Sequence, residues 1–262
     1  SAMTLSSVLF MYLIIVNFVK ILAKIIKIRT MAKKHDIIWL DSIDSTNEEA
    51  RRHIASLDNL SVLSAVSQTA GRGQRGNTWS AKPGENLTFS IVLKYGPGAT
   101  PEIRALDQSV ISEITALSVV DFLGAHGIGT KIKWPNDIYA GDRKICGILI
   151  EHSVRNGLLS SSIIGIGLNV NQRYFDVNLP NPTSMALCLD QALSLPGLLE
   201  EFMQTFRGYW RRYLNITGGL MRVRRLYLSQ MWRKDVHARF IDNSDGREFE
   251  GIIRGLNQIG LI

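Results

Sequence analysis

Between residues 37 and 170 the chain alternates between two spacings of its apolar residues. Some stretches alternate apolar with polar residues or are short apolar runs, which is typical of strands; others repeat apolar residues every three or four positions, which is typical of helices. These patterns predict strands over residues 37–40, 61–67, 87–94 and 158–170. They also predict a long amphipathic helix from Ile103 that ends near Gly124 and Gly127.

Capping and turn signals predict two further features. Ser45 stands three residues before Glu48, so its hydroxyl is expected to satisfy the first free amides of a helix whose buried side includes Ala50. The turn at 140–143 predicts a hairpin with strands over 131–134 and 144–151.

The last third of the chain is simpler. Apolar residues from Leu198 to Trp210 predict a helix, and short strands around the turn at 243–246 predict a small β-rich domain from about residue 229. The closing residues 259–262 resemble an interrupted strand, so we expect this small domain to be incomplete. The main domain is therefore expected over residues 31–228, with the small domain over 229–262.

Residues 1–30 differ from the rest. An apolar run over 8–19 precedes three lysines, is shorter than the roughly 20 residues that span a bilayer, and lacks the preceding positive charge of a secretory signal. Membrane contact is therefore not expected. An interfacial or core-docked helix and a dispensable segment translated from a start upstream of Met31 both remain open.

Charge and cysteine content narrow the functional classes. The net charge of +7 favours an anionic partner, which could be a nucleic acid, a membrane surface, a nucleotide or an acidic protein. The two cysteines, Cys146 and Cys188, lie far apart, and the five histidines show no paired ligand spacing. A structural zinc site is therefore not expected, and a reducing cytoplasm fits the composition.

The glycine-rich stretch 68–76 is the first segment with a candidate chemistry. Its three glycines permit positive backbone dihedrals that turn successive amides into one concavity, to which Arg72 and Arg75 add positive charge. Such a loop can bind an anion, although for the stretch taken on its own a surface turn with solvated arginines is the favoured explanation. A Walker loop is excluded because no Gly-Lys-Ser or Gly-Lys-Thr follows.

Two later segments add polar groups at strand ends. Pro135 imposes an extended residue before it and a turn after it, which exposes Asn136 and Asp137. Lys144 follows a tight turn and begins an otherwise apolar strand, so its ammonium should lie against the sheet. An ordinary edge-strand lysine is the alternative.

Together these segments resemble the biotin protein ligase family, in its monofunctional form without a DNA-binding domain. The motifs that carry the resemblance are Asp44-Ser45-Thr46-Asn47, Gln68 with residues 71–76, residues 133–138, Arg143-Lys144 with Gly147, and residues 165–170. The resemblance extends from about Ile37 to the C-terminus. It implies an α+β fold: a mixed β-sheet flanked by helices, of the class II synthetase-like type shared by biotin and lipoyl ligases, with a small SH3-like C-terminal domain.

The resemblance also implies roles for individual residues. The residues expected to bind biotin are Ser45, Thr46, Asn47, Gln68, Gly71, Arg72, Gly73, Gln74, Lys144 and Gly147. Those expected to bind ATP are Arg75, Trp79, Lys133, Asn136, Asp137 and Asn169. Lys144, Arg72 and Asp137 would be catalytic, with Arg72 at the anionic junction of the two substrates. Mg²⁺ would arrive with ATP near Asp137, without being tightly bound by the protein.

The implied reaction joins two anions. The carboxylate of biotin would attack the α-phosphate of ATP to form biotinyl-adenylate, and a lysine of a biotin carboxyl carrier protein domain would then take the biotinyl group. A fixed cation between the carboxylate and the phosphate, Lys144, would stabilise the transition state. We expect a cytoplasmic enzyme, either a monomer or a homodimer.

One position departs from the family pattern. Many relatives have arginine in the fourth place of the glycine-rich loop, where this chain has Gln74. We hypothesise that Gln74→Arg slows the escape of biotinyl-adenylate, because it adds a cation facing the intermediate. Equal release from both proteins in a single-turnover trapping assay would contradict this, and an equivalent hydrogen bond from Gln74 is the alternative.

Two rival functions remain open at this stage. A lipoate or octanoate protein ligase would share the fold. A nucleic-acid-binding module would account for the basic charge, but about thirty residues before the main domain are too few for a winged helix, so nucleic-acid binding is not expected.

The last third of the chain also contains a basic stretch, which is either a solvated helix face or a docking surface for an acidic carrier domain. Its residues are Arg207, Arg211, Arg212, Arg222, Arg224 and Arg225.

Overall fold

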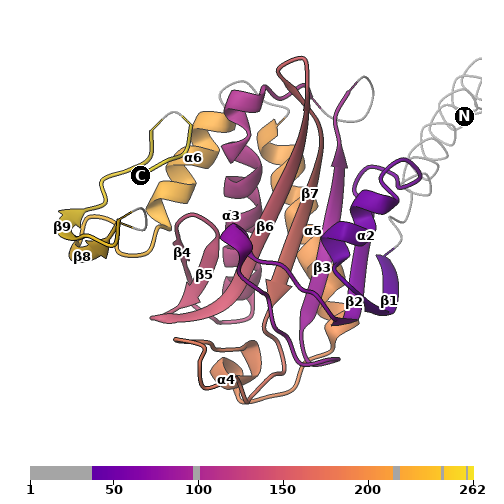
Figure 1. Cartoon of the computed structure of the whole chain (residues 1–262), viewed down its shortest axis with the longest axis horizontal. Helices are drawn as coiled ribbons and strands as arrows, with labels where there is room; N and C mark the ends of the chain where they lie inside the picture. The colour runs from indigo at the N-terminus through magenta and orange to yellow at the C-terminus, as the bar shows by residue number, and fades with distance from the viewer. Residues whose placement is uncertain (1–36, 97–100, 215–218, 243–244, 258) are drawn as a thin grey trace, which may run out of the picture. The chain divides into compact units, whose positions relative to one another are not determined.

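The computed structural model describes residues 37–262 except 97–100, 215–218, 243–244 and 258 (Figure 1). The predicted apolar segment 1–30 therefore lies outside the described residues. The strands are β1 (Ile37–Ile43), β2 (Val62–Gln68), β3 (Leu87–Lys94), β4 (Lys131–Lys133), β5 (Asp137–Ala140), β6 (Arg143–Arg155), β7 (Leu158–Leu168), β8 (His237–Ile241) and β9 (Glu248–Ile252). The helices are α2 (Thr46–Arg52), α3 (Ser109–Ala125), α4 (Met185–Leu189), α5 (Leu195–Leu214) and α6 (Gly219–Ser229).

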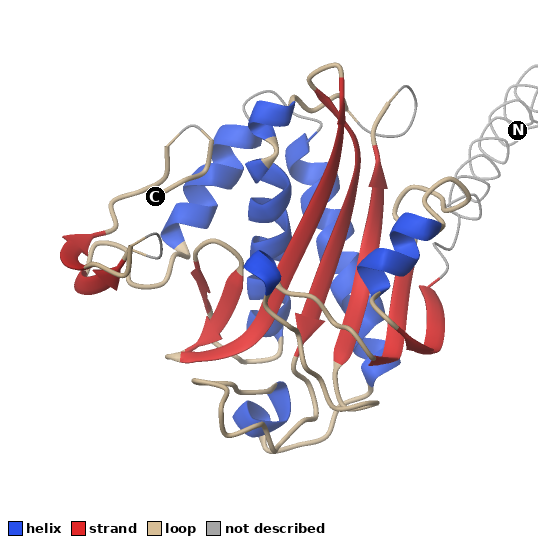
Figure 2. Ribbon diagram, in the orientation of Figure 1, coloured by secondary structure: helices blue, strands red, loops and turns tan. Residues whose placement is uncertain are grey.

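Seven strands form one mixed sheet in the order β1-β2-β3-β7-β6-β5-β4. β1 and β2 are parallel, and the other neighbouring strands are antiparallel. Helices α3, α5 and α6 cover one face of this sheet (Figure 2), where Phe89 of β3 meets Phe202 of α5 with ring centroids 5.4 Å apart. The predicted α+β class with a mixed sheet flanked by helices is confirmed.

The predicted hairpin over 131–134 and 144–151 is wrong in its pairing. A short strand, β5, lies between the two segments, so β4 pairs with β5 and β5 pairs with β6. The chain reverses at Trp134-Pro135 immediately after β4, because proline has no amide hydrogen to continue the strand ladder. Asn136 then ties this turn to β6, since its side-chain amide donates to the Ile148 carbonyl at 2.8 Å.

Helix α3 differs from the predicted amphipathic helix. It starts at Ser109, after a separate turn of 3₁₀-helix at Ala105–Asp107, and Leu106 is exposed. The helix is buried on most sides because the sheet, α5 and α6 all pack against it. Its buried hydroxyls are satisfied locally: Thr115 and Ser118 donate to the carbonyls four residues earlier, each at 2.7 Å. Together with the preceding 3₁₀ turn it forms the segment Ala105–Ala125, which in the described part of the chain is the one helical segment long and apolar enough to cross a membrane, but its burial identifies it as part of the core.

The C-terminal region contains the two predicted strands as the pair β8–β9. Residues 243 and 244 of the predicted turn lie outside the described residues. The domain boundary at 228/229, the SH3-like assignment and its incompleteness remain predictions.

Arg224 of α6 is not part of a solvated helix face. Its Nε donates to Glu113 of α3 at 2.6 Å, and both side chains are largely buried. Burial raises the pKa of the Glu113 carboxyl to about 7, although the charge of Arg224 and hydrogen bonds from Arg224 and Ser109 act in the opposite direction. The pair is therefore a pH-sensitive contact in the core.

We expect the stability contributed by Glu113 to be lost as the pH rises. The folded protein keeps this proton up to about pH 7, whereas the unfolded chain releases it near the ordinary pKa of 4.5, so this contribution is complete below pH 4.5 and declines towards pH 7. In urea unfolding measured from pH 4.5 to pH 8, the free energy of unfolding should fall less steeply with pH in Glu113→Gln than in the wild type. Glu200→Gln, at an exposed position of α5, is the control, and parallel pH profiles for wild type and Glu113→Gln would contradict the assignment.

Candidate active site

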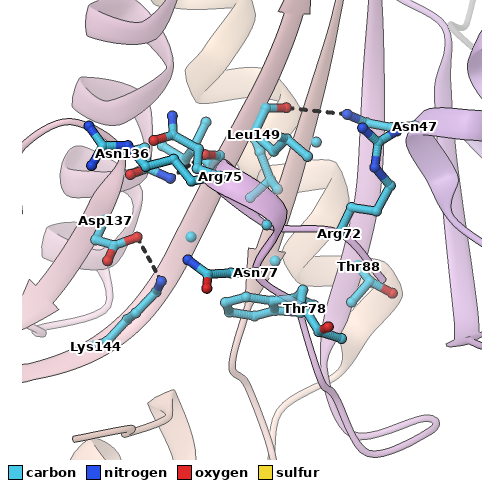
Figure 3. Close-up of a pocket in the computed structure, with 18 of the residues that line it drawn as sticks. Asn47, Arg72, Arg75, Asn77, Thr78, Thr88, Asn136, Asp137, Lys144 and Leu149 are labelled. Atoms are coloured by element: carbon cyan, nitrogen blue, oxygen red, sulfur yellow. Dashed lines mark hydrogen bonds and ion pairs between the residues drawn. The ribbon is translucent and has the colours of Figure 1, made fainter. Parts of the chain in front are cut away.

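A cavity of about 520 Å³ lies on the sheet face opposite α3 (Figure 3). Most residues that the sequence analysis singled out line it: Ser45, Thr46, Asn47, Gln68, Arg72, Gly73, Gln74, Arg75, Trp79, Lys133, Asn136, Asp137, Lys144 and Gly147. The glycine-rich loop and the predicted ammonium group of Lys144 thus share one cavity.

The start of helix α2 forms one end of the cavity, but its cap is not the predicted one. Ser45 occupies the N-cap position without a side-chain capping bond. Instead the side-chain oxygen of Gln68, at the end of β2, accepts from the Thr46 amide at 2.7 Å. The parallel pairing of β1 with β2 brings Gln68 beside the chain that leads into α2, so a partner 22 residues away replaces the local one.

Buried polar groups fix Thr46 and Asn47. The hydroxyl of Ser90, fully buried on β3, lies 2.7 Å from Thr46 Oγ1 and 2.6 Å from Asn47 Oδ1. On its other side Asn47 donates to Glu151 Oε2 of β6 at 2.8 Å. These contacts leave a neutral, hydrogen-bonding surface at this end of the cavity.

Glycines on two neighbouring strands form the floor. Gly147 of β6 is directly opposite Gly167 of β7. A Cβ atom at Gly167 would lie 2.5 Å from Cζ2 and 2.6 Å from Nε1 of Trp79, so the indole lies flat against the backbone there. A Cβ at Gly165, two residues earlier, would lie 2.5 Å from Asn47 Oδ1. Glycine is required at both positions because side chains approach the sheet too closely for any Cβ atom.

The opposite end of the cavity is cationic. Lys144 Nζ forms an ion pair with Asp137 Oδ1 at 2.7 Å and lies 5.6 Å from the centroid of the Trp79 ring. Asp137 begins β5 and Lys144 lies near the start of β6, so the turn between these strands brings the pair together. Lys133, from β4, completes this end and lies 4.8 Å from the centre of the Tyr139 ring. Lys144 is therefore held against the sheet, as the sequence predicted.

The glycine-rich loop crosses the cavity between these ends. Arg75 adopts a left-handed conformation with φ of 55°, and Gly76 follows with φ of 80°. The loop folds back on itself, since the Gly73 amide donates to the Asn77 carbonyl at 2.7 Å and the Trp79 amide donates to the Gly71 carbonyl at 2.9 Å. The loop is thus a compact hairpin-like structure that carries Trp79 to the glycine floor.

Two predicted site residues do not line the cavity. Gly71 lies at the base of the loop, where a Cβ atom would collide with the Trp79 carbonyl oxygen. Asn169 is buried behind the site, and its side-chain amide donates to the Thr183 carbonyl at 2.9 Å. Their predicted ligand contacts stay predictions.

Several residues line the cavity although the sequence alone gave them no individual role, and some of these belong to the motifs 133–138 and 165–170. The whole set is Asn77, Thr78, Thr88, Trp134, Pro135, Ile148, Leu149, Gly165, Ile166 and Gly167. A signal for two of them was present: glycines at 165 and 167, two apart in an apolar strand, mark a close approach on one sheet face. Thr88 and Ser90 gave no signal, because their polar side chains occupy positions that look like ordinary strand alternation.

Comparison with known proteins identifies the family. The model of the biotin/lipoate A/B protein ligase family matches residues 39–169, which contain all of these cavity-lining residues. The chain belongs to this family.

Individual relatives agree with this membership. The bifunctional ligase/repressor BirA of Bacillus spizizenii is 28% identical over 250 residues, which cover 89% of this chain and 73% of that protein. A biotin–[acetyl-CoA-carboxylase] ligase of Paracoccus denitrificans is 36% identical over 130 residues, or 48% of this chain and 51% of that protein. The solved biotin protein ligase of Aquifex aeolicus, in complex with biotin and ATP, has the same fold, with a TM-score of 0.69 at 23% identity over 86% of this chain and 89% of that one.

The site offers few ligands for a resident metal ion. Within the described ranges, no group of three or more histidine, cysteine, aspartate or glutamate side chains could hold one. The carboxylate of Asp137 is paired with Lys144.

Proposed function

We propose that this protein activates biotin with ATP and transfers the biotinyl group to a lysine of a biotin carboxyl carrier domain. The observation that carries the proposal is the division of one cavity into a neutral hydrogen-bonding end at Ser45, Thr46 and Asn47 and a cationic end at Lys144 and Lys133. Biotin has the matching polarity, since a neutral ureido ring and an anionic carboxylate lie at its two ends. The family membership and the names of the relatives support the same conclusion.

The first step forms the adenylate. A carboxylate oxygen of biotin attacks the α-phosphorus of ATP, and the bond from that phosphorus to the bridging oxygen breaks, so pyrophosphate departs with its Mg²⁺. Both reactants are anions that repel each other. Lys144, fixed by Asp137 before substrates arrive, supplies the positive charge between them at no cost of reorganisation.

The second step transfers the acyl group. The amine of the carrier lysine attacks the acyl carbon, the bond from that carbon to the AMP oxygen breaks, and the amine loses its proton as the amide forms. The glycine-rich loop excludes water from the reactive anhydride until the carrier binds. The protein forms no covalent bond to biotin in either step.

An exchange assay tests the proposal. We expect biotin to support ATP–pyrophosphate exchange, whereas lipoate and octanoate, which lack the ureido ring, should be disfavoured by about 10⁴, the discrimination typical of sites that hydrogen-bond their substrate. Exchange with lipoate or octanoate at the rate seen with biotin would instead assign the chain to the other branch of its family. No exchange with any of the three acids would overturn the proposal altogether.

Transfer is tested separately by incubating the protein with biotin, Mg-ATP and a biotin carboxyl carrier domain. Mass spectrometry should detect one biotinyl group on the acceptor lysine and none on a variant carrier with arginine at that position. Adenylate formation without any labelling of the carrier would limit the proposal to the first step.

A further inference from the structure

The guanidinium of Arg72 does not lie at the cationic end of the cavity. Figure 3 shows Arg72 beside Asn47, whereas Lys144 and Asp137 lie on the far side. There the Arg72 guanidinium forms ion pairs with Glu48 of α2 and with Glu151 of β6, the latter at 3.2 Å. The charge of Arg72 is thus met by carboxylates at the end of the cavity that suits a neutral ring.

Glu151 joins three parts of the site. One of its oxygens accepts from Asn47 Nδ2 at 2.8 Å, and the other accepts from Arg51 at 2.6 Å and from Arg72 at 3.2 Å. Burial by itself would raise the pKa of the Glu151 carboxyl, but the hydrogen bonds from Asn47 and Arg51 and the charges of Arg51 and Arg72 hold it below its ordinary value. Glu151 is therefore an ionised hub between β6, the start of α2 and the glycine-rich loop.

Glu48 completes the network. It pairs with Arg72 of the loop and with Arg51, three residues further along α2, at 2.7 Å from the latter. Two carboxylates and two guanidinium groups thus neutralise one another. Isolated surface ion pairs contribute little to stability, but a network with several hydrogen bonds and partly buried carboxylates restricts the groups it connects.

We propose that Glu48 and Glu151 are positioning residues that anchor the glycine-rich loop through Arg72, so that Arg72 fastens the loop instead of contacting the reacting anions. We call Glu48, Glu151 and Arg72 the loop anchor. The inference rests on the proposed function for its kinetic consequences. Its structural consequence, a loop held in place before any substrate binds, is independent of that function.

The geometry gives the anchor a direct effect on the site. Arg72 is next to Gly73, and the loop then runs through Arg75 to Trp79, whose indole lies on the glycine floor. Releasing Arg72 frees the loop from α2 and β6, and losing Glu151 also removes a hydrogen-bond partner that fixes the amide of Asn47. The anchor therefore sets how well the acid substrate is bound and enclosed, while Lys144 acts on the chemical step.

The test compares the double variant Glu48→Gln/Glu151→Gln with Arg72→Gln and with the triple variant. If the anchor operates, both the double variant and Arg72→Gln raise KM for biotin about tenfold, the size expected for losing charge-assisted hydrogen bonds in a partly exposed network, with kcat changed by less than about threefold. The triple variant Glu48→Gln/Arg72→Gln/Glu151→Gln should raise KM for biotin no further than Arg72→Gln does alone, because the three groups act as one unit. Glu49→Gln is the matched control, since Glu49 lies on the same helix but pairs with Arg52.

A second measurement does not depend on activity. Amide hydrogen exchange of residues 71–79, followed by mass spectrometry in the substrate-free protein, should be faster by about tenfold in the anchor variants and unchanged in Glu49→Gln. The inference would be overturned by two results together: the loop of the anchor variants exchanges its amide hydrogens at the wild-type rate, and Arg72→Gln alone lowers kcat by 10² or more. That combination would assign Arg72 to the reacting anions. Absence of any acid-dependent activity in the wild type would instead sink the proposed function, while the exchange measurement would still decide whether the anchor exists.

Discussion

Replacing Lys144 by alanine is expected to slow biotin-dependent ATP–pyrophosphate exchange by about 10² to 10³, the usual effect of removing one preorganised electrostatic donor. Lys144 is the cation that the structure fixes at the end of the cavity opposite the neutral hydrogen-bonding groups, through its ion pair with Asp137. Its loss leaves the carboxylate and the α-phosphate without a charge between them in the transition state. The change should appear mainly in kcat, since the neutral end of the cavity is untouched.

Lys131→Ala is the matched control for this prediction. Lys131 is an exposed lysine on β4 that does not line the cavity and donates to the Gln230 side chain at 2.9 Å. It changes the net charge of the protein by the same amount, so any general electrostatic effect on nucleotide encounter is matched. An unchanged exchange rate in a folded Lys144→Ala protein would remove this residue from the catalytic step.

The second large effect is expected from Gly167→Ala, a single added methyl group on the floor of the cavity. The methyl would lie 2.5 Å from Cζ2 of Trp79, so the indole must move off the sheet and into the space available to the substrate. Overpacking of this kind typically costs about 1–3 kcal/mol, which corresponds to a loss of biotin affinity of roughly fivefold to 150-fold. Isothermal titration calorimetry with biotin measures this loss of affinity.

A double-mutant cycle tests the cause of this effect. If the methyl acts through the indole, Trp79→Ala/Gly167→Ala should bind biotin no more weakly than Trp79→Ala alone. Gly129→Ala is the control, because a Cβ at this exposed glycine meets no atom within 4 Å. Full affinity in Gly167→Ala would mean that the floor tolerates a side chain and that Trp79 does not define the pocket.

Most elements of the fold followed from local pattern, but their pairing did not. Strand β3 has the predicted bounds 87–94, and helix α5 includes the predicted 198–210. The short strand β5 was missed because four residues between a proline and a turn are too few to show a period. The extent of burial of α3 was also missed, since polar residues such as Thr115 satisfy their hydroxyls within the helix and so can lie in the core.

The sequence by itself determined the chemical inventory of the site: a glycine-rich loop with cations, a lysine at the start of an apolar strand, and polar residues at strand ends. These features are local, because residue type, turn chemistry and spacing fix them over a few positions. Only the tertiary structure decided which charges meet. It paired Lys144 with Asp137 and Arg72 with Glu48 and Glu151, and it placed Gly147 opposite Gly167 beneath Trp79. Electrostatic and steric interactions depend on distance in space, and strand order and register set those distances even between residues as far apart in the chain as Trp79 and Gly167.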